Sequence, residues 1–104
     1  MKLFWNDTVV AVQPVINGRP QLRMEVCDGI RKSILPADLF RFGTLKSVPI
    51  SVFYAWAEQR CFPENRVDAE ELLAELGLEK YDPLQIVMKT NARLITDNFW
   101  VDFT

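Results

Sequence analysis

The sequence predicts a single α+β domain, in which antiparallel β-hairpins forming a small sheet are followed by three short helices and a short C-terminal strand. Segments typical of strands fill the first half of the chain, and helical periodicity fills the second, an order that favours α+β over alternating α/β. The 104 residues are 49% hydrophobic, which suffices for one modest core. We therefore assign one domain to 1–104, mainly β over 1–48, mainly α over 50–91, with a strand in 92–104.

Two turn signals predict hairpins near the N-terminus. Residues 2–12 are rich in β-branched and aromatic side chains around Asn6-Asp7, a pair that suits a two-residue turn. Asn17-Gly18 is the strongest hairpin signal of the chain. We expect both turns to join antiparallel strands.

The rest of the first half predicts two shorter strands and a loop. Residues 21–27 alternate between apolar and polar side chains, as in a half-buried strand. Residues 30–35 are expected to form one more short strand, which Pro36 ends. Residues 41–49 contain a glycine and a proline and are expected to form a loop.

The first predicted helix covers 52–61, with Ser51 as its N-cap. Four of its side chains recur at the spacing of one helix face: Phe53, Trp56, Ala57 and Arg60. Tyr54 falls on another face, so one of the two faces should be partly exposed.

Two further helices are predicted by caps. Asp68 precedes an acidic first turn and a leucine stripe over 69–76, and Gly77 suits the position after a helix end. Asp82-Pro83 is the pattern of an N-cap followed by proline in the first turn.

The composition narrows the chemistry. The chain has no histidine, which removes Ser-His-Asp and Cys-His nucleophile systems and imidazole zinc sites. The two cysteines, Cys27 and Cys61, cannot supply a four-cysteine site and are expected to be reduced. The four glycines are isolated, so no phosphate-binding loop is present. We expect a non-enzyme with no cofactor and no metal.

No apolar run approaches the roughly 20 residues of a membrane span. The apolar block near the N-terminus is too short for the core of a signal peptide. We expect a cytoplasmic protein without a membrane partner.

Charge is uneven along the chain. Residues 1–62 carry a net charge of +3 and residues 63–104 carry −5. This division fits either a molecule with two partner surfaces of opposite sign or an acidic surface helix beside scattered arginines.

Aromatic and arginine side chains are the candidates for partner contacts, because such residues anchor protein interfaces. The predicted helix and loop provide five of them: Arg41, Phe42, Tyr54, Trp56 and Arg60. The first functional hypothesis is therefore a protein–protein interaction module.

The second hypothesis is a nucleic-acid-associated regulator that uses the basic half of the chain. Its phosphate contacts would be Arg19, Arg23, Arg31, Lys32 and Lys46. A pI near 5.1 argues against strong nucleic-acid binding.

A longer pattern runs from Trp56 to Val101. Trp56 with Arg60 is followed by Pro63 and Arg66, by a leucine-rich helix, and by a closing run from Thr96 to Trp100. This region resembles the accessory region found ahead of HipA-like kinase domains in Gram-positive bacteria, and related small stand-alone proteins of phages, plasmids and integrative elements. The similarity extends over about two thirds of the chain, with Phe99 where tyrosine is frequent.

The resemblance concerns the accessory region alone, so it implies partner binding and no kinase activity. The implied partner is a HipA-like kinase, a toxin–antitoxin component or a host defence enzyme. The motif residues are expected to be structural. Thr96 and Asp97 would bond to nearby backbone, Trp100 would fill the core, and Pro63 and Arg66 would fix a helix junction.

A homodimer is a further expectation. An exposed strand such as Thr8–Val12 could pair with the same strand of a second copy.

Overall fold

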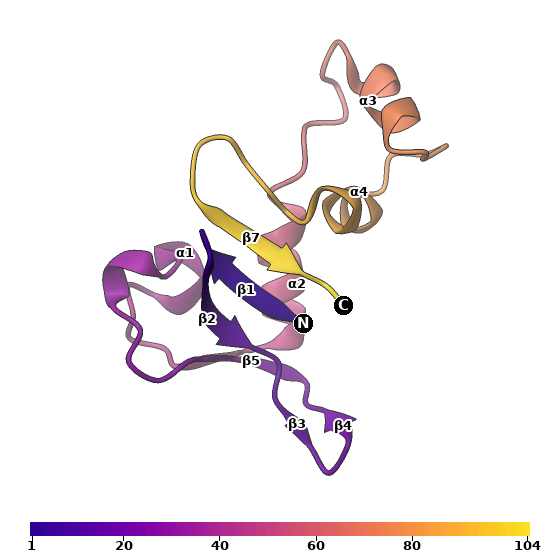
Figure 1. Cartoon of the computed structure of the whole chain (residues 1–104). Helices are drawn as coiled ribbons and strands as arrows, with labels where there is room; N and C mark the ends of the chain where they lie inside the picture. The colour runs from indigo at the N-terminus through magenta and orange to yellow at the C-terminus, as the bar shows by residue number, and fades with distance from the viewer.

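The structure is a computed structural model that describes residues 1–104, and it has the predicted α+β class (Figure 1). Seven strands form along the chain: β1 Lys2–Trp5, β2 Thr8–Val12, β3 Val15–Ile16, β4 Arg19–Pro20, β5 Arg23–Val26, β6 Ser47–Pro49 and β7 Phe99–Asp102. Four α-helices and one short 3₁₀-helix, η1, complete the fold: η1 Lys32–Ile34, α1 Ala37–Phe40, α2 Ile50–Glu58, α3 Ala69–Glu75 and α4 Pro83–Thr90.

The main sheet has five antiparallel strands in the order β6-β5-β2-β1-β7. Both predicted hairpins are present, β1–β2 around Asn6-Asp7 and the separate pair β3–β4 around Asn17-Gly18. The C-terminal strand β7 pairs with β1 along its whole length, which joins the two ends of the chain at one edge of the sheet.

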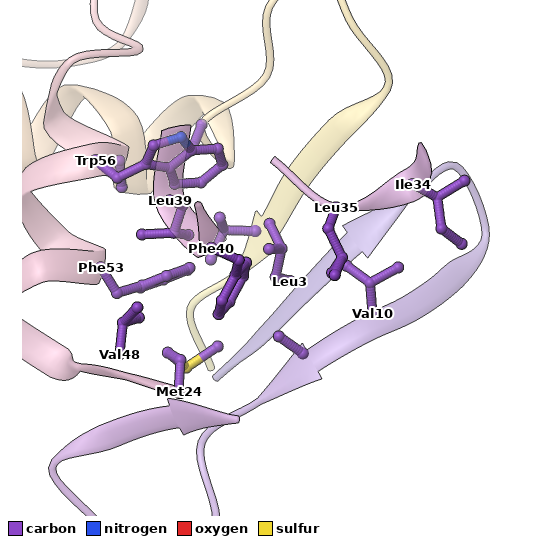
Figure 2. Close-up of a cluster of buried hydrophobic side chains, with 14 of the residues drawn as sticks. Leu3, Val10, Met24, Ile34, Leu35, Leu39, Phe40, Val48, Phe53 and Trp56 are labelled. Atoms are coloured by element: carbon purple, nitrogen blue, oxygen red, sulfur yellow. The ribbon is translucent and has the colours of Figure 1, made fainter. Parts of the chain in front are cut away.

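One face of the sheet holds the core. Leu3 and Met24 point from the strands towards α1 and α2, where Phe40 and Phe53 are fully buried (Figure 2). Val101 of β7 is fully buried in the same cluster. No helix lies on the opposite face at the β1–β7 pair, where Phe4 and Trp100 face each other across the strands. The sheet therefore has one covered face and one open face.

Strand β2 lies in the middle of the sheet, with β1 on one side and β5 on the other. Both of its edges are used inside the chain, so the expected pairing of Thr8–Val12 with a second copy is wrong. The outer strand β7 is also partly covered, because the Val101 amide donates to the Asn91 carbonyl at 2.8 Å.

Two predictions in the middle of the chain were wrong. Residues 30–35 contain η1 instead of a strand, because β5 already has neighbours on both sides and leaves no edge for another. Residues 41–49 are not all loop, because Ser47–Pro49 forms the edge strand β6. Proline lacks an amide hydrogen and is tolerated at such an edge.

The helix starts also differ in part. Helix α2 begins at Ile50, earlier than expected, and no side chain caps it. The Ile50 amide instead donates to the Leu22 carbonyl at 3.0 Å. Asp68 does not cap α3 either, because its carboxylate pairs with Arg66 at 2.6 Å. Asp82 caps α4 as predicted, through the Gln85 amide.

Helix α3 stands apart from the sheet in Figure 1. Its leucine side chains are only half-buried, and Ala69 is its one buried residue. Phe62 and Tyr81 meet at the base of this segment: the Tyr81 hydroxyl donates to the Phe62 carbonyl at 2.6 Å, and the rings pack edge to face. Residues 63–80, here called the acidic arm, therefore leave and rejoin the rest of the fold at the Phe62–Tyr81 contact. None of the helices has the length and apolarity that a membrane crossing requires.

Candidate functional site

The turn after α1 exposes a large aromatic side chain on a strained backbone. Arg41, Phe42 and Gly43 adopt left-handed conformations in succession, with φ of 46°, 57° and 82°. A left-handed conformation costs a non-glycine residue roughly 1–2 kcal/mol. The Phe42 side chain is 78% exposed, so no burial in the core offsets this cost.

Hydrogen bonds hold this turn in place. The Phe42 amide donates to Ala37 at 3.1 Å, and the Gly43 and Leu45 amides donate to Phe40 at 3.0 and 3.1 Å. The Thr44 hydroxyl donates to the Arg41 carbonyl at 2.7 Å. Phe42 is thus presented in a fixed position instead of on a free loop.

Gly43 brings a second segment close to the turn. A Cβ atom on Gly43 would lie 2.5 Å from Cγ of Lys32, so only glycine fits here without a shift of that side chain. Lys32 and the adjacent Arg31 are exposed, as is Arg41, and none of them forms an ion pair. We call Arg31, Lys32, Arg41 and Phe42 the α1 surface. It combines residues from both functional hypotheses.

The other predicted arginine–aromatic pair lies inside. Trp56 is 6% exposed and Arg60 is 8% exposed, and the guanidinium lies 4.8 Å from the centre of the Trp56 ring. The Trp56 indole donates to Asp38 at 3.2 Å. Because so little of either side chain is exposed, these two residues serve to stabilise the fold. The prediction that they contact a partner does not fit their burial. Tyr54 is half-buried on a neighbouring face of α2.

Arg60 connects α2 to the segment that precedes β7. Its guanidinium makes two bonds to the Asp97 carboxylate, at 2.8 and 2.6 Å, and donates to the carbonyls of Ala92 at 2.6 Å and Phe99 at 3.1 Å. The hydrogen bonds from Arg60 hold the pKa of Asp97 below its ordinary value, despite the opposing effect of burial. The Asp97 carboxylate also accepts a hydrogen bond from the Phe99 amide at 3.0 Å, which is the expected bond to nearby backbone.

Trp100 does not fill the core, contrary to expectation. Side chains alternate along β7, so the burial of Val101 turns Trp100 to the open face of the sheet. There its ring stacks on Phe4 with centroids 4.2 Å apart, and Arg93 covers its other side at 4.4 Å. The indole nitrogen donates to the Asn6 carbonyl at 2.8 Å. Both faces of the ring are occupied.

The remaining predicted residues are spread over the surface. Arg19 lies on the β3–β4 hairpin, and Arg23 pairs with Glu25 at 2.7 Å. Lys46 is exposed just before β6. Arg19, Arg23 and Lys46 therefore do not form one continuous site with the α1 surface.

Of the other motif residues, Thr96 is exposed and makes no side-chain bond to the backbone, contrary to expectation. Pro63 and Arg66 lie exposed where the acidic arm leaves the body, and the Arg66 amide donates to the Pro63 carbonyl at 3.1 Å.

Two open grooves flank residues 93–95. One, of about 690 Å³, lies beside Asn6, Asp7 and Trp100. The other, of about 490 Å³, lies between the acidic arm and α4. No group of three metal-ligating side chains comes together. Cys27 and Cys61 are free and only half-buried, and burial raises the pKa of the Cys27 thiol with a further contribution from Asp28.

Sequence reasoning missed Arg93 and Phe4. Arg93 is exposed, stacks on Trp100 and borders both grooves. Phe4 is the cross-strand neighbour of Trp100. The alternation of buried residues along each strand could have predicted which face of the sheet these side chains occupy. No local pattern in the sequence could have predicted that β1 and β7, which are far apart in the chain, pair with each other.

Comparison of the chain with protein-family models, with curated proteins and with solved structures finds no match in any of the three.

Proposed function

We propose that this protein is a non-catalytic interaction module that binds an acidic, partly apolar surface of a partner protein through its α1 surface. The observation that carries the proposal is Phe42, a large apolar side chain that is 78% exposed on a left-handed backbone. Strained, exposed residues of this kind cluster at binding sites, where a fixed position lowers the entropic cost of association.

Charge defines the partner. Residues 28–46 contain four basic and two acidic side chains, whereas the whole chain has a net charge of −2. One of those two acids, Asp38, is engaged by the Trp56 indole. Arg31, Lys32 and Arg41 have no carboxylate partner within the chain and are free to meet one on another protein. The partner would place an apolar pocket on Phe42 and acidic side chains around it.

The resemblance to the region ahead of HipA-like kinase domains supplies the first partners to test. They are a HipA-like kinase, a toxin–antitoxin component and a host defence enzyme, with this chain as a small bacterial or phage regulator. The proposal on Phe42 does not depend on that choice.

The test is a tagged pull-down from host lysate treated with nuclease, read by mass spectrometry. Wild type is compared with Phe42→Ala and with Leu22→Ala, a control in which the lost side chain is equally exposed, at 79%, but lies before β5. We expect a stoichiometric protein that Phe42→Ala loses and Leu22→Ala retains. Equal recovery by both variants would contradict the proposed site.

Nucleic-acid binding is the second candidate, because Lys32 packs against Gly43, the residue next to the exposed Phe42, and basic and aromatic groups together also bind single strands. Fluorescence anisotropy with a labelled single-stranded oligonucleotide at low and moderate salt separates the two functions. Binding that falls steeply with salt and needs Arg31, Lys32 and Lys46 would favour this candidate.

A further inference from the structure

The groove between the acidic arm and α4 combines an apolar floor with an unusual charge. Phe62, Leu72, Ile86 and Leu94 supply apolar side chains from four different segments of the chain. Three arginines also line the groove and no carboxylate does, although residues 63–104 carry a net charge of −5. The groove is thus locally positive within the acidic half of the molecule.

Two of these arginines are neutralised from outside the groove. Arg60 binds Asp97 at 2.6 Å, and Arg66 binds Asp68 at 2.6 Å. Arg93 forms no ion pair. The central carbon of its guanidinium lies over the Trp100 ring, 4.4 Å from the ring centre, and a guanidinium placed over an aromatic ring keeps N–H donors for a carboxylate.

The size of the groove indicates a small ligand. Its volume of about 490 Å³ falls in the range of small-molecule sites. One wall of the groove, Leu72, belongs to α3, and another, Phe62, packs edge to face against Tyr81.

We propose that this groove binds a small amphipathic carboxylate of the medium-chain fatty-acid class. The carboxylate pairs with Arg93 through charge-assisted hydrogen bonds, and the alkyl chain lies on Leu72, Ile86 and Leu94. An uncharged amphiphile of the same length lacks the group that Arg93 recognises. This site is separate from the α1 surface, and it stands whether or not that surface binds a partner protein.

Sodium decanoate, kept below its aggregation concentration, is the probe, and ¹H–¹⁵N correlation spectra of the full chain are the readout. We expect saturable shifts confined to the amides of Cys61, Leu72, Ile86 and Ile95. Decanol at the same concentration should cause weak shifts. Shifts that are equal for decanoate and decanol, or absent with decanoate, would overturn the proposal.

Two single-residue variants test whether Arg93 is the arginine that binds the carboxylate. Arg93→Gln should weaken decanoate binding about tenfold, the effect of losing one charge-assisted hydrogen-bonding partner. Arg19→Gln, on the β3–β4 hairpin, removes another exposed arginine without an ion pair and should leave the affinity unchanged. Equal losses in both variants would overturn the assignment to this groove.

A second variant covers the case in which Arg93→Gln disturbs the stack on Trp100. Ile95 is fully exposed at the groove rim, so Ile95→Asp adds a carboxylate there without opening a cavity. It should repel decanoate and weaken its binding severalfold while the rest of the spectrum is unchanged. Undiminished binding by Ile95→Asp would contradict a site for a carboxylate.

Discussion

Two arginine–aromatic pairs of this chain have opposite surroundings. Trp56 lies on the inner face of α2 and Arg60 follows the end of that helix, and the two side chains are in contact and buried. Arg41 and Phe42 follow α1 and are exposed on a left-handed turn. The residue types are similar, but one pair stabilises the fold and the other is free to bind a partner. Position on an element, more than residue type, decides between the two.

The buried pair is matched by a partner far along the chain. Arg60 donates hydrogen bonds to the carboxylate of Asp97, 37 residues later, and to two backbone carbonyls. The exposed pair has no such partner. A buried charge is tolerated only when it is paired and hydrogen-bonded, so the folded state needs both Arg60 and Asp97. Arg41 is exposed and needs no such partner.

The largest expected difference is in stability. Arg60→Ala removes the guanidinium that donates to the carbonyls of Ala92 and Phe99, and it leaves the Asp97 carboxylate with the Phe99 amide as its donor. We expect the free energy of unfolding to fall by roughly 3 kcal/mol, the lower end for a broken buried pair because Asp97 is partly exposed. Arg41→Ala should change it by less than about 0.5 kcal/mol. Urea unfolding followed by tryptophan fluorescence measures both, and equal values would refute the contrast.

A smaller effect comes from pH. The pKa of Asp97 is lowered mainly by its hydrogen bonds to Arg60, so the folded state favours the ionised carboxylate. The resulting stability is present above the ordinary aspartate value of 3.8 and is lost as the pH falls through the lowered pKa. Asp97→Asn should therefore be less stable than wild type at neutral pH, and the difference should shrink in acid.

Asp102 is the control for that titration. Its pKa is also lowered, by hydrogen bonds from Thr104, but the group is half-buried at the end of β7 and has no arginine partner. Urea midpoints from pH 7 to pH 2 should separate Asp97→Asn from Asp102→Asn, with Asp97→Asn causing the greater loss of stability at neutral pH. A constant difference between Asp97→Asn and wild type across this range would show that the carboxylate charge contributes nothing.

Much of the fold could be predicted, because its signals are local. Turn pairs predicted both hairpins, and helical spacing predicted the stripe that contains Phe53, Trp56 and Arg60. The same spacing argued against Trp56 and Arg60 as contact residues, since a stripe shared with Phe53 faces the core. Of the α1 surface, only the neighbouring pair Arg41 and Phe42 could be predicted as one site. Lys32 lies earlier in the sequence and comes close to this pair only in the folded chain.

The rest depended on contacts between distant residues. The pairing of β1 with β7 placed Trp100 beside Phe4, and Arg60 binds Asp97, which lies 37 residues later in the sequence. The left-handed conformations of Arg41 and Phe42 also lacked a local signal, because arginine and phenylalanine are not residues that usually adopt this conformation.

The last prediction sets stability against binding at Phe42. Glycine adopts a positive φ without steric cost, so Phe42→Gly relieves strain while losing almost no burial. We expect the free energy of unfolding to rise by about 0.5–1 kcal/mol, after the greater flexibility of glycine in the unfolded chain is counted. Partner capture should be lost in the same variant.

Leu22→Gly is the matched control for Phe42→Gly, because the Leu22 side chain is equally exposed but its backbone has no positive φ. Glycine there relieves no strain and adds flexibility to the unfolded chain, so stability should fall by up to about 1 kcal/mol while capture is retained. Opposite signs in urea unfolding and in capture would identify Phe42 as a residue kept at the expense of stability. A destabilised Phe42→Gly that still captures the partner would mean that the turn serves the fold, as Arg60 does, and that binding lies elsewhere.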